Sequence, residues 1–274
     1  MIPLEDNAED IIGKAMRGLA MSAETLAAAS AASVSDITAL RRGAFDPAVA
    51  RRVAGLLGLD AASLEGIGLH QWRPAPQQVE GLHSFRSEGG MAANSYVVHH
   101  ATSGTLLVFD TGEQSDAMLA QIRQLAGGVR AIFITHTHRD HIACLDRLRL
   151  HFPAAPVYVG RLEPLPGAVL VEDGQRFDFG ALQVECRLTT GHSAGGITYV
   201  VDGLERQLAL VGDALFAGSM GGGMVSWHDA LENNRRKIFT LPDAAVVCPG
   251  HGPLTTIGEE KRHNPFYPEF KQST

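Results

Sequence analysis

The sequence predicts an α+β protein in which a small all-helical region, residues 1–70, precedes a strand-rich region, residues 79–274. In the second region, short apolar runs rich in β-branched residues recur. Several of these runs lead into a polar residue close to a glycine, which is typical of buried strands that end at one edge of a sheet. The first region carries helix-capping signals at short intervals instead. Residues 71–78 contain two prolines and are expected to form an extended linker.

Five short helices are expected in residues 1–70. Serine or aspartate precedes four of the predicted starts, where its side chain can accept a hydrogen bond from the first turn, and glycine follows two predicted ends. The expected landmarks are a first helix near residues 9–21, starts at Ser22, Ser33, Asp46 and Asp60, and ends at Gly43 and Gly58. Ser33 and Asp36 also match a capping box, and Pro47 suits a first helical position.

The strand-rich region contains one dense polar cluster, the motif H-x-H-x-D-H at positions 136–141. The apolar run before it, residues 131–135, is expected to form a strand buried on both faces. Residues 142–150 have helical apolar spacing, so the motif's last two residues, Asp140 and His141, are expected in a first helical turn. Imidazole and carboxylate are ligands that first-row metals such as zinc prefer. A solvated histidine-rich loop is the alternative.

Four further polar residues follow apolar runs in the same way. They are Asp110, His192, Asp213 and His251. One type of strand end therefore recurs five times, with a potential ligand or orienting group at each tip. Strand ends are where open α/β sheets usually place their chemistry, so these side chains are expected to meet.

In this order the five motifs resemble the metallo-β-lactamase superfamily, and the resemblance covers residues 79–274. It implies an αββα sandwich and two divalent metal ions, zinc first, with iron or manganese as alternatives. It also implies one ion held by His136, His138 and His192, a second held by Asp140, His141 and His251, and Asp213 bridging them. Two ions that share a carboxylate and a water provide a hydroxide nucleophile at neutral pH.

Two carboxylates and three other side chains are assigned further roles. Asp110 and Asp140 are the predicted catalytic carboxylates, and Asp110 is expected to orient metal ligands rather than bind metal, with a capping role as its alternative. Arg139 is a candidate for binding an anionic group of the substrate, or else a surface arginine. Met220 and His228 belong to a glycine- and methionine-rich loop predicted to form an apolar rim, although His228 also suits a helix start.

The residue at position 213 limits the class of substrate that we expect. Antibiotic-hydrolysing lactamases most often carry cysteine where this chain has Asp213, so a β-lactam is not expected. The tail around residues 249–266 resembles short glyoxalase II-like hydrolases, which favours an ester-like bond and a thioester in particular. The rival within the same fold is an iron-dependent persulfide dioxygenase, which uses one metal held by two histidines and one aspartate.

The helical region resembles both the repressor-type helix-turn-helix domain and the N-terminal domain of cyanase, which does not bind DNA. Residues 1–70 contain six basic and nine acidic side chains, a net charge of −3. DNA affinity depends on phosphate neutralisation, and residues 33–42 contain no Asn, Gln or Lys to read bases. Homo-oligomerisation or covering of the substrate is therefore favoured over nucleic-acid binding. A DNA-binding regulator with a metal-domain sensor is the alternative from another class.

Composition supports a metal-dependent enzyme acting on a small-molecule substrate. The chain has 274 residues, 45% of them hydrophobic, and a net charge of −7, which gives no electrostatic case for nucleic acid or acidic membranes. Three widely separated cysteines argue against a disulfide framework and favour a reducing cytoplasm. The acidic first residues lack a secretion signal, and no apolar run reaches the length of a membrane span.

Overall fold

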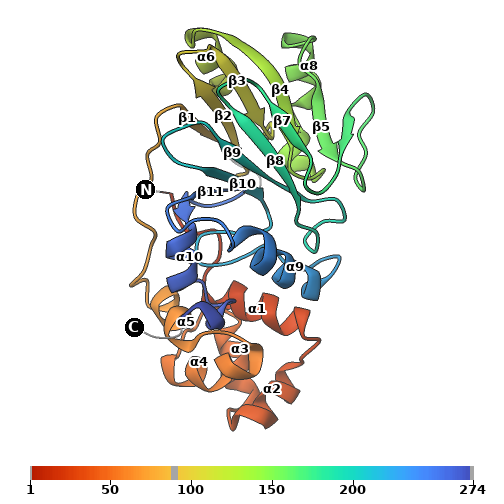
Figure 1. Cartoon of the computed structure of the whole chain (residues 1–274). Helices are drawn as coiled ribbons and strands as arrows, with labels where there is room; N and C mark the ends of the chain where they lie inside the picture. The colour runs from red at the N-terminus through yellow and green to blue at the C-terminus, as the bar shows by residue number, and fades with distance from the viewer. Residues whose placement is uncertain (1, 88–91, 272–274) are drawn as a thin grey trace.

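The structure, a computed structural model, describes residues 2–87 and 92–271. Two mixed β-sheets face each other in the upper part of Figure 1, helices cover their outer faces, and the N-terminal helices lie below them. The layers form because alternate side chains of each strand point to opposite faces, so both faces of each sheet need cover. The α+β class and its αββα order of layers are confirmed.

In the described residues the first sheet has six strands, and their order in the sheet follows their order in the chain. They are β1 (Leu82–Arg86), β2 (Asn94–His100), β3 (Thr105–Phe109), β4 (Gly128–Ile134), β5 (Val157–Gly160) and β6 (Val169–Val171). β1 to β3 are antiparallel neighbours, whereas β3 to β6 run parallel. The second half of β4 is fully buried, as its run of branched and aromatic residues predicts.

The second sheet also has six strands within the described ranges. They are β7 (Arg176–Asp178), β8 (Gln183–Leu188), β9 (Ile197–Asp202), β10 (Leu208–Gly212), β11 (Val246–Pro249) and β12 (Thr255–Thr256). β10 and β11 are parallel, and the other neighbours are antiparallel. The parallel pair brings the ends of β10 and β11 to the same edge, where both lead into ligand candidates.

Apolar side chains fill the space between the sheets and beneath the outer helices. Phe133 lies between Phe109 and Tyr199, with ring centroids 5.2 and 4.9 Å away. α6 (Asp116–Gln124) and α8 (Leu145–His151) cover the first sheet. α9 (Trp227–Asn233), extended by a π-helical turn (Asn234–Ile238), and α10 (Ile257–His263) cover the second. A final 3-10 turn, Pro268–Lys271, follows α10.

The described part of residues 1–70 forms five short α-helices, as predicted. They are α1 (Ala8–Gly18), α2 (Ala23–Ser30), α3 (Val34–Leu40), α4 (Pro47–Ala54), which a 3-10 turn (Gly55–Leu57) follows, and α5 (Ala61–Gly68). Ser22, Ser33, Asp46 and Asp60 each accept a backbone hydrogen bond at the expected starts, and the capping box of Ser33 is formed. No helix in the described ranges is long and apolar enough to span a bilayer.

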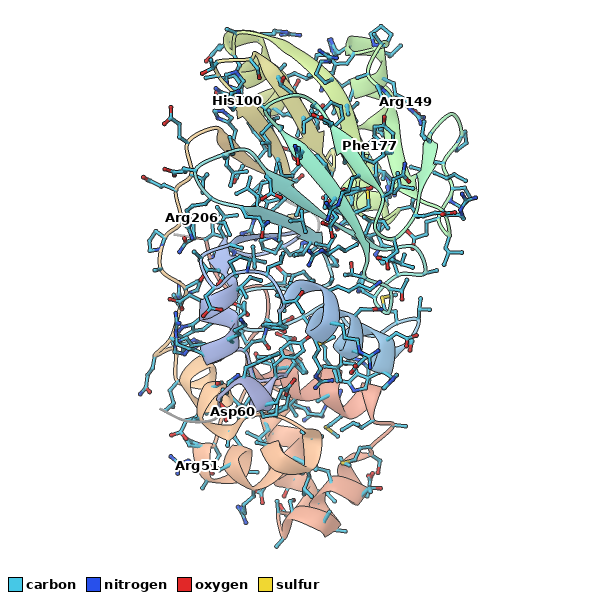
Figure 2. All side chains as sticks on the ribbon, in the orientation of Figure 1. Arg51, Asp60, His100, Arg149, Phe177 and Arg206 are labelled. Atoms are coloured by element: carbon cyan, nitrogen blue, oxygen red, sulfur yellow. The ribbon has the colours of Figure 1, made fainter. Side chains whose placement is uncertain are left out.

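The N-terminal helices share one apolar core with the outer helices of the second sheet. Residues of α1 and α5 belong to the same buried cluster as Met220 and Phe239. Lys14 Nζ donates to the carbonyl of Met220 at 2.8 Å, and the backbone N–H of Asp60 donates to the carbonyl of Pro265 at 2.8 Å. Figure 2 shows Asp60 at this junction. The N-terminal helices therefore pack directly against the strand-rich region and are not joined to it by the linker alone.

The linker is extended, but it is also packed. Trp72 stacks on His263 with ring centroids 5.0 Å apart, and its indole N–H donates to Glu259 at 3.3 Å. Further along, Gln77 accepts from Arg206 at 2.8 Å, and Figure 2 shows Arg206 beside the linker. The predicted extended linker is therefore held at two points, to α10 through Trp72 and to the loop before β10 through Gln77.

Candidate metal centre

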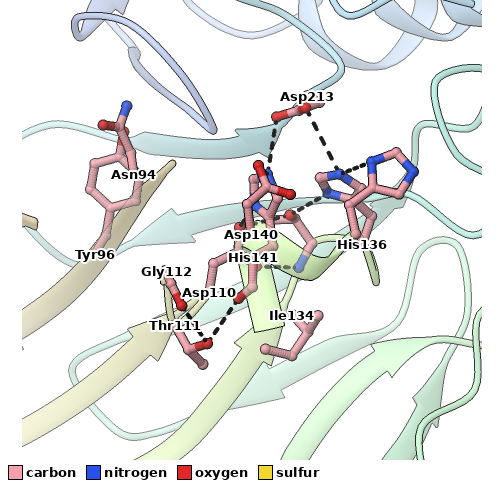
Figure 3. A network of polar contacts seen from close by, with 12 residues as sticks. Asn94, Tyr96, Asp110, Thr111, Gly112, Ile134, His136, Asp140, His141 and Asp213 are labelled. Carbon is pink, nitrogen blue, oxygen red and sulfur yellow. Dashed lines mark hydrogen bonds and ion pairs between the residues drawn. The ribbon is translucent and has the colours of Figure 1, made fainter. Parts of the chain in front are cut away.

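The ligand candidates meet where strands of both sheets end (Figure 3). β3 leads into Asp110, β4 into the H-x-H-x-D-H motif, β10 into Asp213 and β11 into His251. Asp140 and His141 lie on a short helix, α7 (Arg139–Ile142), as the spacing predicted. Segments separated by more than 100 residues therefore contribute to one site.

Three histidines and an aspartate form the first cluster. His136, His138, His192 and Asp213 offer ligand atoms within 4.8 Å of one another. His138 Nδ1 lies 3.0 Å from His136 Nε2 and 3.1 Å from His192 Nε2. His192 Nδ1 donates to the carbonyl of Gly222 at 3.1 Å, so the lone pair of its Nε2 faces the cluster. A cation fits among these nitrogens because it can accept several lone pairs at once.

Asp140, His141 and His251 form the second cluster, with ligand atoms again within 4.8 Å. Asp140 Oδ2 lies 3.2 Å from His251 Nε2. Three buried atoms of the site, Asp140 Oδ2, His141 Nε2 and Asp213 Oδ1, lack a hydrogen-bond partner in the described structure. Folded proteins rarely leave buried polar atoms unpaired, so the donor set fits a bound cation here as well.

Asp213 lies between the two clusters (Figure 3). Its Oδ1 is 3.3 Å from His141 Nε2, and its Oδ2 is 3.4 Å from His192 Nε2 and 3.5 Å from His251 Nε2. Burial alone would raise the pKa of Asp213, but the surrounding histidines, His141 first, hold it well below its usual value. An ionised carboxylate thus faces ligands of both clusters.

Asp110 supports ligands of both clusters by hydrogen bonds. Its Oδ2 accepts from His141 Nδ1 at 2.9 Å and from the Thr135 hydroxyl at 2.8 Å, and its Oδ1 accepts from the Thr135 backbone at 2.8 Å. The Thr135 oxygen can then accept from His136 Nδ1, 3.1 Å away. Both histidines therefore keep their protons on Nδ1 and turn the Nε2 lone pair toward the cluster.

The profile of the metallo-beta-lactamase superfamily matches residues 89–251, a range that contains every ligand candidate. The chain belongs to this superfamily. The N-terminal helices precede the matched range.

Two curated members of the superfamily illustrate the range of similarity. The chain is 31% identical over 189 residues to a probable metallo-hydrolase of Streptococcus pyogenes serotype M6, which covers 59% of this chain and 81% of that protein. It is 26% identical over 183 residues to a hydroxyacylglutathione hydrolase of Haemophilus influenzae, which covers 58% of this chain and 85% of that protein.

Solved structures show the same sandwich. The crystal structure of ETHE1 from Myxococcus xanthus superposes with a TM-score of 0.61 at 27% identity, over 69% of this chain and 87% of the other. A protein solved in a di-iron-bound form, TTHA1623, superposes with a TM-score of 0.55 at 28% identity, over 66% of this chain and 99% of the other.

The residues expected to bind substrate lie on three different segments of the chain, and two of them are exposed. Arg139 is exposed in the first turn of α7, and His228 is exposed in the first turn of α9. Met220 differs from the predicted flexible rim, because its side chain is fully buried and its sulfur lies 3.4 Å from the Tyr267 hydroxyl. The exposed methionine of this loop is Met224, at 73% exposure.

Glu163 is a structural support that the sequence did not reveal. Its Oε2 accepts from the Thr137 backbone at 2.8 Å, and its Oε1 accepts from the Gly195 backbone at 2.9 Å. Burial raises the pKa of Glu163, but these N–H groups and nearby hydroxyls lower it below its usual value. The carboxylate ties the loop of His138 to the loop of His192, although no motif surrounds it.

The N-terminal segment also reaches the metal centre, which sequence reasoning missed. Glu5 packs against Gly252, the neighbour of His251, and Asp6 accepts hydrogen bonds from Lys14 and Ser219. The Lys14 ammonium lies 5.1 Å from the centroid of the Phe216 ring, whose edge-on neighbour is His251. The contacts of Glu5 with Gly252, Asp6 with Ser219 and Lys14 with Phe216 each join residues more than 200 positions apart, so no local pattern could have predicted them.

Proposed function

We propose that the chain is a dinuclear metal-dependent hydrolase that cleaves an ester-like bond, with thioesters as the preferred class. The observation that carries this proposal is the contact of two buried ligand clusters at Asp213. Seven ligand residues exceed what one four- or five-coordinate ion needs. A shared carboxylate is the feature that lets two ions approach each other.

The proposed ligand sets follow the two clusters. One ion would be held by His136, His138 and His192, the second by Asp140, His141 and His251, and Asp213 would contact both. Zinc is the proposed metal, with iron or manganese as alternatives, because imidazole and carboxylate suit all three. Ions bound here supply Lewis acidity and lower the pKa of a water toward neutrality.

The protein's own groups prepare the site. Asp110 and Thr135 hold the Nδ1 protons of His141 and His136, which leaves both Nε2 atoms free to bind metal. Asp140, oriented by His251, is the proposed second catalytic carboxylate. Arg139 is exposed beside these ligands, where its guanidinium can pair with an anionic part of a small substrate.

Two facts favour a thioester. The similar Haemophilus influenzae protein is a hydroxyacylglutathione hydrolase, and a hydroxyacylglutathione is a thioester. In addition, the residue between the clusters is an aspartate, whereas resemblance to the antibiotic-hydrolysing branch would call for cysteine.

Metal analysis of protein purified without added metal tests the proposal. We expect close to two ions per chain in the wild type, and a loss of both in Asp213→Ala, because the shared carboxylate is removed. The purified protein should then hydrolyse thioesters in preference to lactones and phosphodiesters. An equal metal content in wild type and Asp213→Ala contradicts the shared role of this residue.

A persulfide dioxygenase is the second candidate, and structural similarity to ETHE1 of Myxococcus xanthus favours it. By resemblance, that activity needs one iron on two histidines and one aspartate. It predicts a single tightly held iron and oxygen consumption with a persulfide. The same metal analysis, combined with an oxygen electrode, therefore separates the two candidates.

A further inference from the structure

A cavity of about 750 Å³ lies outside the metal centre, between the edge strand β1 and the segment before β12. Ser84 and Arg86 of β1 pair with Tyr96 and Asn94 of β2, and paired residues point to the same face of a sheet. These four line one wall. The opposite wall is residues 252–254, and residues 73–77 of the linker with the N-terminal segment form the cover. The volume is that of a small-molecule site.

Three neutral polar residues of the cavity, Asn94, Tyr96 and Gln77, are already paired within the protein. Asn94 Nδ2 donates to the carbonyls of Pro249 and Gly252 at 3.0 and 2.9 Å, and the Tyr96 hydroxyl donates to Pro249 at 2.7 Å. Figure 3 shows Asn94 and Tyr96 side by side, next to the metal ligands. Gln77 is bonded to Arg206 and Ala75. A ligand would therefore meet mainly apolar surface, from Leu4, Phe85, Pro76 and Leu254 among others.

The charge of the cavity is opposite to that of the chain. Among the residues that the structure describes, no aspartate or glutamate lines it, whereas the whole chain has a net charge of −7. Arg86 is half-buried in its wall, and no hydrogen bond or ion pair joins Arg86 to any other residue in the described ranges. A partly desolvated guanidinium without a partner attracts one carboxylate or similar anion.

We propose that this cavity binds an anionic amphiphile, which is an aliphatic or aromatic body that carries one carboxylate or sulfonate. The anionic group pairs with Arg86, and the body lies against the proline- and leucine-rich cover. The site is distinct from the metal centre, since no ligand candidate lines it. Its cover comes from the N-terminal segment and the linker, outside the range that matches the superfamily.

Calorimetric titration of the metal-loaded full-length protein with dodecanoate, below its micelle concentration, tests the proposal. We expect one molecule bound per chain, and no binding of dodecyltrimethylammonium, which has the same body and the opposite charge. Arg86→Gln should raise the Kd for dodecanoate about tenfold or more, as expected for loss of a charged hydrogen bond. Arg130→Gln, at an exposed arginine outside the cavity, is the matched control and should leave the Kd unchanged.

A second variant keeps the test decisive if Arg86→Gln folds poorly. Ser84 is exposed on an edge strand, so Ser84→Phe should be tolerated by the sheet while its ring fills the cavity and abolishes dodecanoate binding. Circular dichroism and the melting temperature establish that each variant is folded. An unchanged Kd in folded Ser84→Phe, or equal binding of the cationic amphiphile, overturns the proposal. Both readouts are independent of hydrolysis, so they stand apart from the test of the proposed reaction.

Discussion

At the scale of single residues, Asp110 links the two halves of the metal centre. It has a φ of +55°, a left-handed backbone conformation that is uncommon outside glycine. In this position its two oxygens accept three hydrogen bonds from Thr135 and His141. Strained residues cluster at functional sites because the surrounding contacts hold them in place.

Replacing Asp110 with asparagine should weaken metal binding without removing a proposed ligand. An amide has one acceptor oxygen, so it can replace only one of the two carboxylate oxygens: its NH2 group then faces either the Thr135 backbone N–H or the donors at Oδ2, Thr135 Oγ1 and His141 Nδ1. We expect metal affinity to fall by about 10- to 100-fold, the usual effect of losing such a supporting group. Competition with a chelator of known affinity measures this. Unchanged affinity would show that the histidines do not need the carboxylate to fix their tautomers.

A second prediction concerns Gly250, because a side chain at this position would clash with two of the proposed metal ligands. A Cβ atom added at Gly250 would lie 2.2 Å from Asp213 Oδ1 and 2.6 Å from His141 Cε1. Gly250→Ala should therefore displace the shared carboxylate and lower the metal content of purified protein. Gly222→Ala is the matched control, since a Cβ there has open space around it. Equal metal content in both variants contradicts the packing argument.

At the scale of elements, α10 connects the metal-bearing loops to the N-terminal helices. Its Glu260 is fully buried and accepts hydrogen bonds from Thr255, Asn264 and the Gly218 backbone at 2.8 to 2.9 Å. Burial raises the pKa of Glu260 from 4.5 to about 7, although these donors oppose the shift. The group holds the loop after Asp213 against the helix.

The raised pKa of Glu260 predicts a pH dependence of stability. The folded state keeps its proton to a higher pH than the unfolded state, so the free energy of unfolding falls as pH rises from about 4.5 to 7. Glu260→Gln removes this contribution. Between pH 4.5 and 7 the free energy of unfolding of the wild type should therefore fall by at most about 3 kcal/mol more than that of the variant. Urea unfolding of both proteins at several pH values measures it. Parallel stability curves would contradict a raised pKa.

The sequence of residues 1–70 predicts a helix-turn-helix-like domain, whereas the charge of this region argues against DNA binding. α3 exposes Val34 and Ser35, and neither of these side chains carries a positive charge that could neutralise a phosphate. We expect no sequence-specific DNA binding at physiological salt, because an acidic module releases few counterions. A gel-shift screen at stated salt checks this. Nanomolar binding to one sequence would favour the regulator hypothesis instead.

At the scale of the whole molecule, the N-terminal helices belong to the fold of the metal domain. They share a buried apolar cluster with Val211 of β10 and with Leu215 and Met220 in the loop after Asp213. The apolar residues of α1 and α5 already pack within the chain, so these two helices do not need cover from another copy of it. Homo-oligomerisation stays a prediction.

Deleting residues 1–70 should therefore do more than remove an accessory domain. The ligand sequence is intact in such a chain, since every proposed ligand lies after residue 135, which by itself suggests that metal binding persists. The shared core indicates instead that deletion exposes a contiguous apolar face and causes aggregation. Size-exclusion chromatography of the truncated protein tests this. A soluble truncated chain with two ions and an unchanged melting temperature contradicts it.

The sequence by itself determined the helix starts, the strand ends and the residues that meet at the metal centre. These features are local: a cap is set by residues three apart, and a strand end by the glycine beside it. The H-x-H-x-D-H motif likewise places its ligands within one strand end and one helical turn. The order of the remaining ligands was enough to indicate the superfamily and its layers.

Only the tertiary structure decided how the site is supported and covered. Lys14 donates to Met220 across 206 positions, and Glu163 joins two loops that share no sequence pattern. The cavity beside β1 likewise exists only because the linker and the N-terminal segment cross the open edges of two sheets. Such contacts depend on how finished elements pack, and packing is selected by shape and burial over the whole chain rather than by any local period.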